Sequence, residues 1–261
     1  MNGNLTVHFL PSLVPAAAFR GCVAIVVDLL RASTTITCAL AAGAASIRPF
    51  CEIDETRHYA ERQSPRPLLG GERKGVKIAG FDLDNSPARY TADVVGNREI
   101  AFTTTNGTRA LTHVAESDRV LVGAFVNLNT VVTVAAGTKK PVRVVCAGTG
   151  GEITGEDVLC AGAIVSGLER AAGMMLENDE AGIARAMFEQ QATEKARFRE
   201  ALRTSRGGRN LVSLGLESDI EISGTFDRYQ VVGEYFTAEN RIIPVNDVPN
   251  EIPRWVAVSV G

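Results

Sequence analysis

Short apolar runs along the chain predict its strands. The clearest are Val23–Val27, Arg119–Val122 and Val142–Cys146, with few polar residues among them. A strand with one face in water alternates apolar and polar positions, whereas a parallel strand covered on both faces is apolar throughout. The pattern therefore predicts an α/β protein with buried parallel strands and helices on both sides of the sheet.

Helical patterns occupy the segments between these runs. Apolar residues spaced three or four apart, with Ser, Thr or Asn at several starts, are typical of amphipathic helices with N-caps. We expect four such helices, at residues 33–45, 108–116, 129–136 and 156–172. Two more are expected between residues 178 and 205, where the many charges would form a solvated face.

The second half of the chain adds a hairpin and a loose internal parallel. Residues 229–236 and 241–245 flank a short polar turn and predict an antiparallel pair. Residues 23–38 and 142–160 each read as strand, turn and helix, so residues 1–138 and 139–261 could be related subdomains of one domain. Any two βα units share this order, and that interpretation stays open.

Composition narrows the classes of partner. The 261 residues are 45% hydrophobic and 22% charged, which is enough for a substantial core. The 27 basic and 30 acidic residues give a net charge of −3, and no basic run indicates nucleic-acid binding. The apolar run Val23–Val27 is far shorter than the roughly 20 residues that span a bilayer, so we expect no membrane partner.

Five cysteines are scattered through the chain without a CxxC pair. An odd number argues against a complete disulfide framework, so we expect a reducing, cytoplasmic location. No heptad pattern or apolar stripe indicates an oligomer, and a homo-oligomer stays open.

The first candidate site follows the strand Val23–Val27. Ligands of open α/β sheets bind beyond the carboxyl ends of the strands, and Asp28 stands there with Arg31, Ser33 and Thr34 close behind. Asp28 could bind a divalent metal or attack phosphorus, and Arg31 could neutralise phosphate oxygens. Alternatively, Ser33 or Thr34 caps a helix and Asp28 pairs with Arg31. We favour a functional Asp28, because a charge directly after a buried strand is costly unless it is used.

A glycine-bracketed segment, GGERKG at residues 70–75, is the second candidate. Flexible backbone around Glu72, Arg73 and Lys74 would let one acidic and two basic side chains converge on an anionic ligand. An exposed charged turn is the simpler alternative. The segment indicates a ligand site only together with its neighbours.

Two further segments offer carboxylates. In GFDLDNSP at residues 80–87, Asp82 and Asp84 could supply oxygen ligands to Mg²⁺ or form an Asx turn. In a glycine-rich segment after Cys146, Glu156 and Asp157 either face a ligand or meet the dipole at the start of a helix.

The segment TTTNGT at residues 103–108 joins a short strand to a helix. Such a junction aims free backbone N–H groups and small hydroxyls at one point, which suits a phosphate or another anion. The candidate ligands of that anion are Thr104, Thr105, Asn106, Gly107 and Thr108.

Familiar phosphate-binding motifs are not matched. Residues 70–75 have the glycine spacing of a Walker A loop, but Val76 stands where Lys is required. The segment after Cys51 has the spacing of a cysteine phosphatase, yet three acids and no glycine there would repel phosphate. Leu30 stands where a haloacid-dehalogenase-type phosphatase needs a second Asp.

Together these segments resemble the ComB family, the 2-phosphosulfolactate phosphatases. In chain order the resemblance lies in VDLLRASTTI (27–36), GGERKG (70–75), GFDLDNSP (80–87), TTTNGT (103–108), CAGTG (146–150) and EDVLCAG (156–162), with SRGGRNL (205–211) as a further candidate. Two residues depart from the family pattern. Asp84 stands where glycine is expected, and Lys74 where a small residue is frequent.

The resemblance implies a three-layer α/β/α fold with a mixed, largely parallel sheet and two related subdomains. It also implies a Mg²⁺-dependent acid phosphatase that converts (2R)-phosphosulfolactate, a small anionic phosphomonoester, into sulfolactate and phosphate, a step toward coenzyme M. The expected catalytic residues are Asp28, Arg31 and Glu72; the expected Mg²⁺ ligands are Asp28, Asp82, Glu156 and Asp157; and the expected substrate contacts are Ser33, Thr34, Arg73, Lys74, Thr104, Thr105, Asn106, Gly107 and Thr108.

Four alternatives stay open. Asp28 is either a nucleophile or a metal ligand, and either Lys74 or an arginine faces the sulfonate. A family member outside the coenzyme M pathway would hydrolyse another small anionic phosphomonoester. A protein that keeps the fold without catalysis would bind the anion only.

Overall fold

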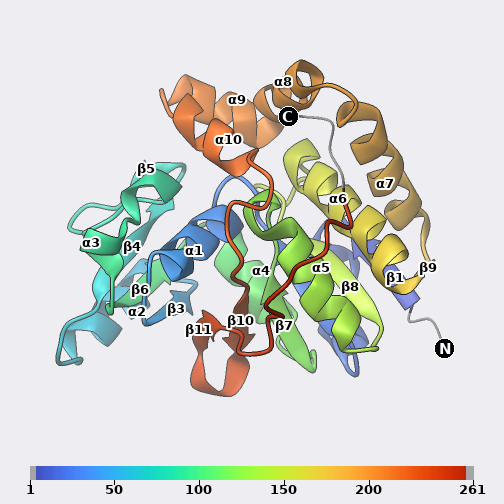
Figure 1. The fold of residues 1–261 in the computed structure, drawn as a ribbon. Helices are drawn as coiled ribbons and strands as arrows, with labels where there is room; N and C mark the ends of the chain where they lie inside the picture. Colours follow the sequence, from blue (N-terminus) through green and yellow to red (C-terminus); the bar gives the residue numbers. More distant parts are fainter. Residues whose placement is uncertain (1–3, 257–261) are drawn as a thin grey trace.

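The computed structural model describes residues 4–256, which form one mixed sheet of 11 strands with helices around it (Figure 1). The strands are β1 (Asn4–His8), β2 (Val23–Val27), β3 (Ser46–Phe50), β4 (Leu68–Arg73), β5 (Val76–Lys77), β6 (Glu99–Thr103), β7 (Arg119–Val122), β8 (Val142–Cys146), β9 (Met175–Leu176), β10 (Gly233–Phe236) and β11 (Arg241–Pro244). The α-helices are α1 (Ala32–Ala41), α2 (Ile53–Glu61), α3 (Ala92–Val95), α4 (Gly107–His113), α5 (Leu128–Gly137), α6 (Gly155–Ala172), α7 (Asp179–Gln191), α8 (Lys195–Thr204), α9 (Arg206–Ser213) and α10 (Glu217–Ser223).

The three clearest apolar runs form strands with the predicted bounds. They are β2, β7 and β8, which pair in parallel with β2 in the middle. Successive side chains of β2 point to opposite faces: Ile25 belongs to a core with residues of α5 and α6, and Val26 to a core with residues of α1 and α4. Helices cover both faces of the sheet, which confirms the three-layer α/β/α prediction.

The predicted helices are present with small shifts in their bounds. They correspond to α1, α4, α5 and α6, and the segment between residues 178 and 205 forms α7 and α8. The largest shift is in α1, which ends at Ala41 instead of residue 45. Gly43 follows with a φ of 85°, a left-handed conformation that is common just after helices and ends them.

The predicted C-terminal hairpin lies in the middle of the sheet, although its first strand begins at Gly233 instead of residue 229. The strand order is β5-β4-β6-β3-β11-β10-β7-β2-β8-β1-β9. The antiparallel pair β10 and β11 separates the parallel block β4-β6-β3 from the parallel block β7-β2-β8-β1-β9. Strands from before and after residue 138 therefore alternate across the sheet, and a common origin of the two halves stays a prediction.

Twist brings the two parallel blocks to one site. The blocks run in opposite senses, because three antiparallel pairings lie between β3 and β7. Neighbouring strands rotate by about 20 to 25°, so the pairings from β6 to β2 accumulate roughly 100° or more. This rotation lets the carboxyl ends of β6 and β2 approach each other despite their opposite senses.

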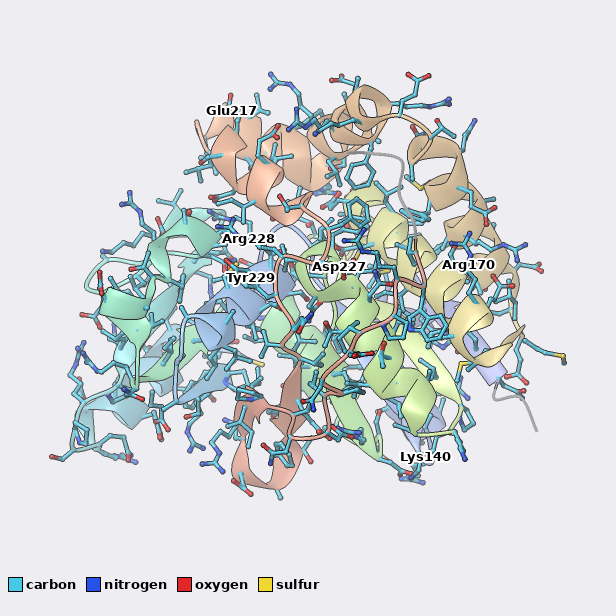
Figure 2. All side chains as sticks on the ribbon, viewed as in Figure 1. Lys140, Arg170, Glu217, Asp227, Arg228 and Tyr229 are labelled. Carbon is cyan, nitrogen blue, oxygen red and sulfur yellow. The ribbon has the colours of Figure 1, made fainter. Side chains whose placement is uncertain are left out.

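The segment between α10 and β10 crosses the helical layer and fastens the hairpin to it. Figure 2 labels Asp227, Arg228 and Tyr229 on this segment. The N–H of Asp227 donates to the carbonyl of Phe125 at 2.9 Å. The Asp227 carboxylate in turn accepts the backbone N–H of Asn129, at the start of α5, at 2.6 Å. The C-terminal segment is thereby held against the turn after β7.

The structure also describes the state of the cysteines and the length and hydropathy of the helices. All five cysteines are free thiols. Within residues 4–256, no helix is both long enough and apolar enough to cross a membrane.

Close packing of α6 against α7 gives a first prediction. An added Cβ on Gly162 would lie 2.0 Å from the carbonyl oxygen of Ala184, so Gly162→Ala should lower the free energy of unfolding by about 1 to 3 kcal/mol. Gly182, on α7, has open space at its Cβ position, and Gly182→Ala should raise that free energy by up to about 1 kcal/mol. Urea unfolding measures both variants, and equal effects would contradict the close α6–α7 contact.

Candidate active site

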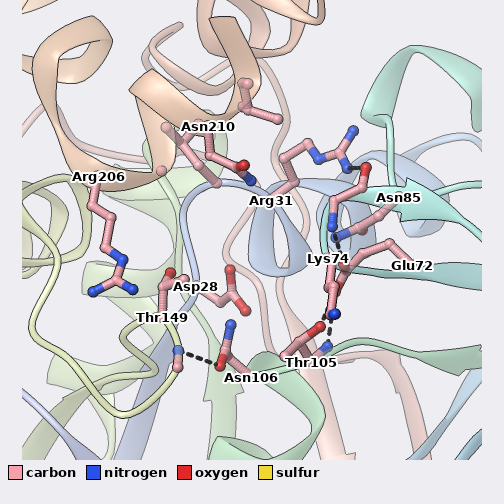
Figure 3. A pocket seen from close by; sticks show the side chains of 15 residues that line it. Asp28, Arg31, Glu72, Lys74, Asn85, Thr105, Asn106, Thr149, Arg206 and Asn210 are labelled. Carbon is pink, nitrogen blue, oxygen red and sulfur yellow. Dashed lines mark hydrogen bonds between the residues drawn. The ribbon is translucent and has the colours of Figure 1, made fainter. Parts of the chain in front are cut away.

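A pocket of about 290 Å³ opens where the turns after β2, β6 and β8 meet the β4–β5 turn and helix α9 (Figure 3). Its lining comes from segments that are far apart in the sequence. The lining residues are Asp28, Leu30, Arg31, Glu72, Lys74, Gly75, Asn85, Thr105, Asn106, Thr149, Gly150, Arg206, Gly207, Asn210 and Leu211. The fold thus gathers part of every predicted segment except EDVLCAG (156–162) around one cavity.

Asp28 follows β2 directly, and its side chain points into the pocket (Figure 3). Oδ1 accepts the N–H of Ala32 at 3.3 Å. An added Cβ on Gly107 would lie 2.7 Å from Oδ2, which explains why a glycine stands there. Burial first, and then the negative charge of Glu72, raise the pKa of Asp28 to about 7. Near neutral pH, Asp28 can therefore either keep its proton or exist as a carboxylate.

Arg31 is fixed by a buried ion pair. Its Nη1 lies 2.7 Å from Oδ2 of Asp219, and both residues are almost fully buried, at 3% and 0% exposed. Its Nη2 donates to the carbonyl of Gly75 at 2.9 Å. The other oxygen of Asp219 accepts the hydroxyl of Ser86 at 2.6 Å. The alternative in which Arg31 pairs with Asp28 is wrong, because the partner comes from α10.

Glu72 joins two of the predicted segments. It lies in β4, so GGERKG begins as a buried strand and only Lys74 and Gly75 form the turn. Oε1 of Glu72 accepts the N–H of Thr105 at 2.8 Å and its hydroxyl at 2.9 Å. Oε2 accepts the N–H of Gly75 at 2.6 Å. Glu72 therefore fixes the pocket wall by hydrogen bonds from both of its oxygens.

The turn after β6 provides fewer free groups for an anion than its sequence suggests. The N–H of Thr105 is taken by Glu72, and Oγ1 of Thr104 accepts the N–H of Thr108 at 3.4 Å. The hydroxyl of Thr108 donates back to the carbonyl of Thr104 at 3.1 Å. Thr104 and Thr108 are buried and stabilise the start of α4, whereas Thr105 and Asn106 line the pocket.

Three other expected substrate contacts do not line the pocket. The buried Ser33 accepts the N–H of Asp28 at 2.8 Å, and the buried Thr34 donates to the carbonyl of Leu29 at 2.9 Å. Neither caps α1, because the turn after β2 uses both hydroxyls. Arg73 donates to the carbonyl of Cys51 at 2.7 Å and is directed away from the pocket. The exposed Lys74 does line the pocket, and its φ of 55° explains why a small residue suits that position.

Two of the expected metal ligands are committed to the backbone. Asp82 accepts the N–H of Leu69 at 2.8 Å and pairs with Arg66 at 3.1 Å, outside the pocket. Asp157 accepts the N–H of Leu29 at 2.8 Å through one oxygen and that of Gly148 at 3.0 Å through the other. Asp157 therefore ties together the turns after β2 and β8.

The neighbouring motif residues have structural partners as well. Asp84 accepts the N–H of Ser86 at 2.9 Å, so the Asx-turn interpretation is confirmed. Glu156 lies in the first turn of α6 and is 2% exposed. Its Oε1 accepts the N–H of Gly207 at 3.2 Å, while its Oε2 has no hydrogen-bond partner among the described residues. Burial raises the pKa of both Glu156 and Asp157.

The site fits a weakly coordinated Mg²⁺ ion better than the four-carboxylate set expected from the resemblance. Within the described part of the chain, no three His, Cys, Asp or Glu side chains converge to hold a metal ion. Mg²⁺ usually takes one or two carboxylates and keeps water or substrate phosphate as its other ligands. Asp28, which faces the pocket, is the residue that would hold such an ion. The unpartnered oxygen of Glu156, behind Gly207, is the next candidate.

The sequence interpretation missed the residues that α9 and α10 contribute. Arg206 and Asn210 line the pocket from α9, and Asp219 of α10 holds Arg31. The SRGGRNL segment could have indicated Arg206, since it was already a candidate for the family resemblance. Nothing local marks Asp219, which is 188 positions from its partner in the sequence.

The buried ion pair gives a prediction with a control on the same helix. Asp219→Ala leaves the buried Arg31 charge unpaired, so the free energy of unfolding should fall by about 3 to 5 kcal/mol. Glu221, also on α10, pairs with Arg199 where both side chains are 55% exposed, and Glu221→Ala should cost at most about 1 kcal/mol. If denaturant unfolding gives the two variants similar losses, the ion pair does not hold the site together.

The raised pKa of Asp28 predicts a pH-dependent gain from Asp28→Asn. The folded protein favours protonated Asp28. The contribution of this group to the free energy of unfolding is therefore fully present below the ordinary pKa of 3.8, and it is lost as the pH rises through about 7. Asn resembles the protonated form at every pH. Asp28→Asn should therefore be as stable as the parent near pH 4 and more stable at pH 8, by urea unfolding. Asp54→Asn, at an exposed site on α2, controls for the loss of one charge, and a gain that does not grow with pH would refute the buried-carboxyl account.

Comparison with known proteins identifies the family. The family model described as 2-phosphosulpholactate phosphatase matches residues 8–237. Three relatives carry the name probable 2-phosphosulfolactate phosphatase. The protein of Symbiobacterium thermophilum is 40% identical over 210 residues, which cover 80% of this chain and 89% of the relative. That of a Synechococcus species is 38% identical over 230 residues, covering 86% and 93%, and that of Pseudothermotoga lettingae is 37% identical over 239 residues, covering 92% and 98%. The chain therefore belongs to the 2-phosphosulfolactate phosphatase family of phosphoric monoester hydrolases.

Proposed function

We propose that this chain hydrolyses (2R)-2-phosphosulfolactate to sulfolactate and phosphate with the help of Mg²⁺. The observation that carries the proposal is Asp28, an acid of raised pKa that faces a polar pocket lined by the cations Arg31, Lys74 and Arg206. A carboxyl group in such a pocket suits phosphoryl transfer, where catalysis is mostly positioning and neutralisation of charge. The shared name of the relatives supports the choice of substrate.

Each group of pocket residues has its own role in this proposal. The phosphate would lie beside Asp28, with the side chains of Asn106 and Thr105 on one side and Arg31 on the other. Asp219 fixes the orientation of the Arg31 guanidinium. Little free energy is therefore needed to reorient this group as charge develops on the phosphoryl oxygens. Glu72 keeps the Thr105 turn and the Gly75 turn at a fixed separation. Cations on the walls, Lys74 among them, would face the remaining acid groups of the substrate.

Mg²⁺, when bound, would polarise the phosphoryl oxygens and lower the pKa of a bound water. Asp28 would hold the ion as a carboxylate, and a cation beside it favours that form over the protonated one. Asp28 as nucleophile remains the alternative role, and both roles need its carboxylate.

The test follows phosphate release from (2R)-phosphosulfolactate with Mg²⁺ and after its removal by EDTA. The parent should lose its activity in EDTA and regain it with added Mg²⁺. Asp28→Asn should lower kcat at least 10²-fold, because Asn can neither bind the ion as an anion nor attack phosphorus. Asp93→Asn, at an exposed site on α3, should keep the parent rate. A near-full rate for Asp28→Asn would remove Asp28 from the mechanism.

A panel of small phosphomonoesters separates the other candidate functions. Faster hydrolysis of a different anionic phosphomonoester would replace the substrate and keep the reaction class. Binding of phosphate or sulfolactate, seen as thermal stabilisation, without turnover of any ester would indicate a non-catalytic anion-binding protein. We favour hydrolysis, because a pocket that only stores an anion needs no carboxyl group beside it.

The family resemblance also supports two broader proposals. Sulfolactate release would place the chain in coenzyme M biosynthesis in an organism that makes this coenzyme. The five free thiols support a cytoplasmic location, since reducing conditions keep cysteines unpaired.

A further inference from the structure

Helix α9 closes one side of the pocket: Arg206 lies across the cavity from Lys74 (Figure 3), and Asn210 lies against the β4–β5 turn, with its Nδ2 3.1 Å from the position of an added Cβ on Gly75. Arg206 begins this helix and Asn210 stands one turn further on, so both side chains lie on the same helix face and line the pocket. The turn after β2 also lies against the helix, since an added Cβ on Gly207 would be 3.2 Å from the Cβ of Leu30. A ligand beside Asp28 would therefore meet polar groups of α9.

The backbone beneath Arg206 is held in place by close contacts. Ser205 caps α9 by accepting the N–H of Gly208 at 3.0 Å, and Glu156 accepts the N–H of Gly207 at 3.2 Å. An added Cβ on Gly207 would lie 2.2 Å from Oε1 of Glu156, and one on Gly208 would lie 2.0 Å from the carbonyl oxygen of Leu202. The two glycines of SRGGRNL thus let α9 pack closely against its neighbours, and this packing fixes the backbone at Arg206.

The side chain of Arg206 can change partners more easily than that of Arg31. Arg31 is buried in its pair with Asp219. Arg206 instead pairs at the surface with Glu152, where the two side chains are 39% and 70% exposed. A pair as exposed as this contributes little, so an incoming anion can displace Glu152 at small cost. Nη2 of Arg206 already lies beside the pocket residue Gly150, 3.9 Å from the position of an added Cβ.

We propose that Arg206, assisted by Asn210, binds one of the two other acid groups of the substrate, its carboxylate or its sulfonate, while the phosphate lies beside Asp28. The inference rests on the proposed function and deepens it, because it makes α9 the element that selects phosphomonoesters with a further anionic group. The planar guanidinium matches the oxygens of a sulfonate or a carboxylate, and the Asn210 amide can donate to a third oxygen. Arg206 is then a specificity-determining residue whose effect depends on the substrate.

The experiment compares Arg206→Ala with Arg209→Ala on two substrates. Arg209 lies on the same helix but bonds the carbonyl of Thr204 at the surface, so it controls for the loss of a positive charge near the site. For (2R)-phosphosulfolactate, Arg206→Ala should lower kcat/KM about 10- to 100-fold, the effect of losing a hydrogen bond to a charged group. For isopropyl phosphate, which has no second acid, it should change kcat/KM less than about twofold. Arg209→Ala should be near the parent on both.

Two further measurements identify which acid group Arg206 binds. They also distinguish a failure of this inference from a failure of the proposed function. With 2-phospholactate, which keeps the carboxylate and lacks the sulfonate, an undiminished effect of Arg206→Ala assigns the carboxylate, and a lost effect assigns the sulfonate. Calorimetric titration with sulfolactate and with inorganic phosphate needs no turnover: Arg206→Ala should weaken sulfolactate binding about 10-fold or more and leave phosphate binding unchanged. Equal losses on phosphosulfolactate and isopropyl phosphate, or no loss on either, would overturn the inference. Absence of turnover by the parent would instead refute the proposed function.

Discussion

The buried ion pair between Arg31 and Asp219 is the interaction on which the site depends. It links the turn after β2 to α10, which is 188 positions away in the sequence. Through Gly75 and Ser86 it also holds the β4–β5 turn and the segment after it. Two buried charges are stable only when both are paired and their remaining groups are hydrogen-bonded, and here they are. The same contacts that orient Arg31 thus hold the C-terminal helices over the pocket.

The carboxyl groups in and around the pocket differ in how much of their hydrogen-bonding capacity the protein uses. Asp157 and Glu72 accept N–H donors with both oxygens, so they shape the loops. Asp28 accepts the N–H of Ala32 at a long 3.3 Å and faces the cavity. Its raised pKa reflects this incomplete compensation of a half-buried charge. The lack of hydrogen bonds that makes the Asp28 carboxylate unfavourable for folding also leaves its oxygens free to act on a ligand.

The sequence predicted those parts of the molecule that depend on local pattern. The bounds of β2, β7 and β8 follow from apolar runs, and Asp28 could be placed at a strand end because strand and turn are adjacent in the chain. It did not predict which hydrogen-bonding groups were already taken: the N–H of Thr105 is used by Glu72, from another strand. Nor could it predict Asp219, because a long-range ion pair leaves no spacing to recognise. Local motifs named the segments of the site, and packing decided which side chains face it.

We propose that the phosphate of the substrate lies beside Asp28 and that its carboxylate or its sulfonate lies beside α9. The most direct test is a crystal structure of the Asp28→Asn variant with (2R)-phosphosulfolactate and Mg²⁺. We expect the phosphorus atom within reach of residue 28, Asn106 and Arg31, with an acid group of the ligand at Arg206. A ligand bound in the reverse orientation, or outside this pocket, would contradict the account.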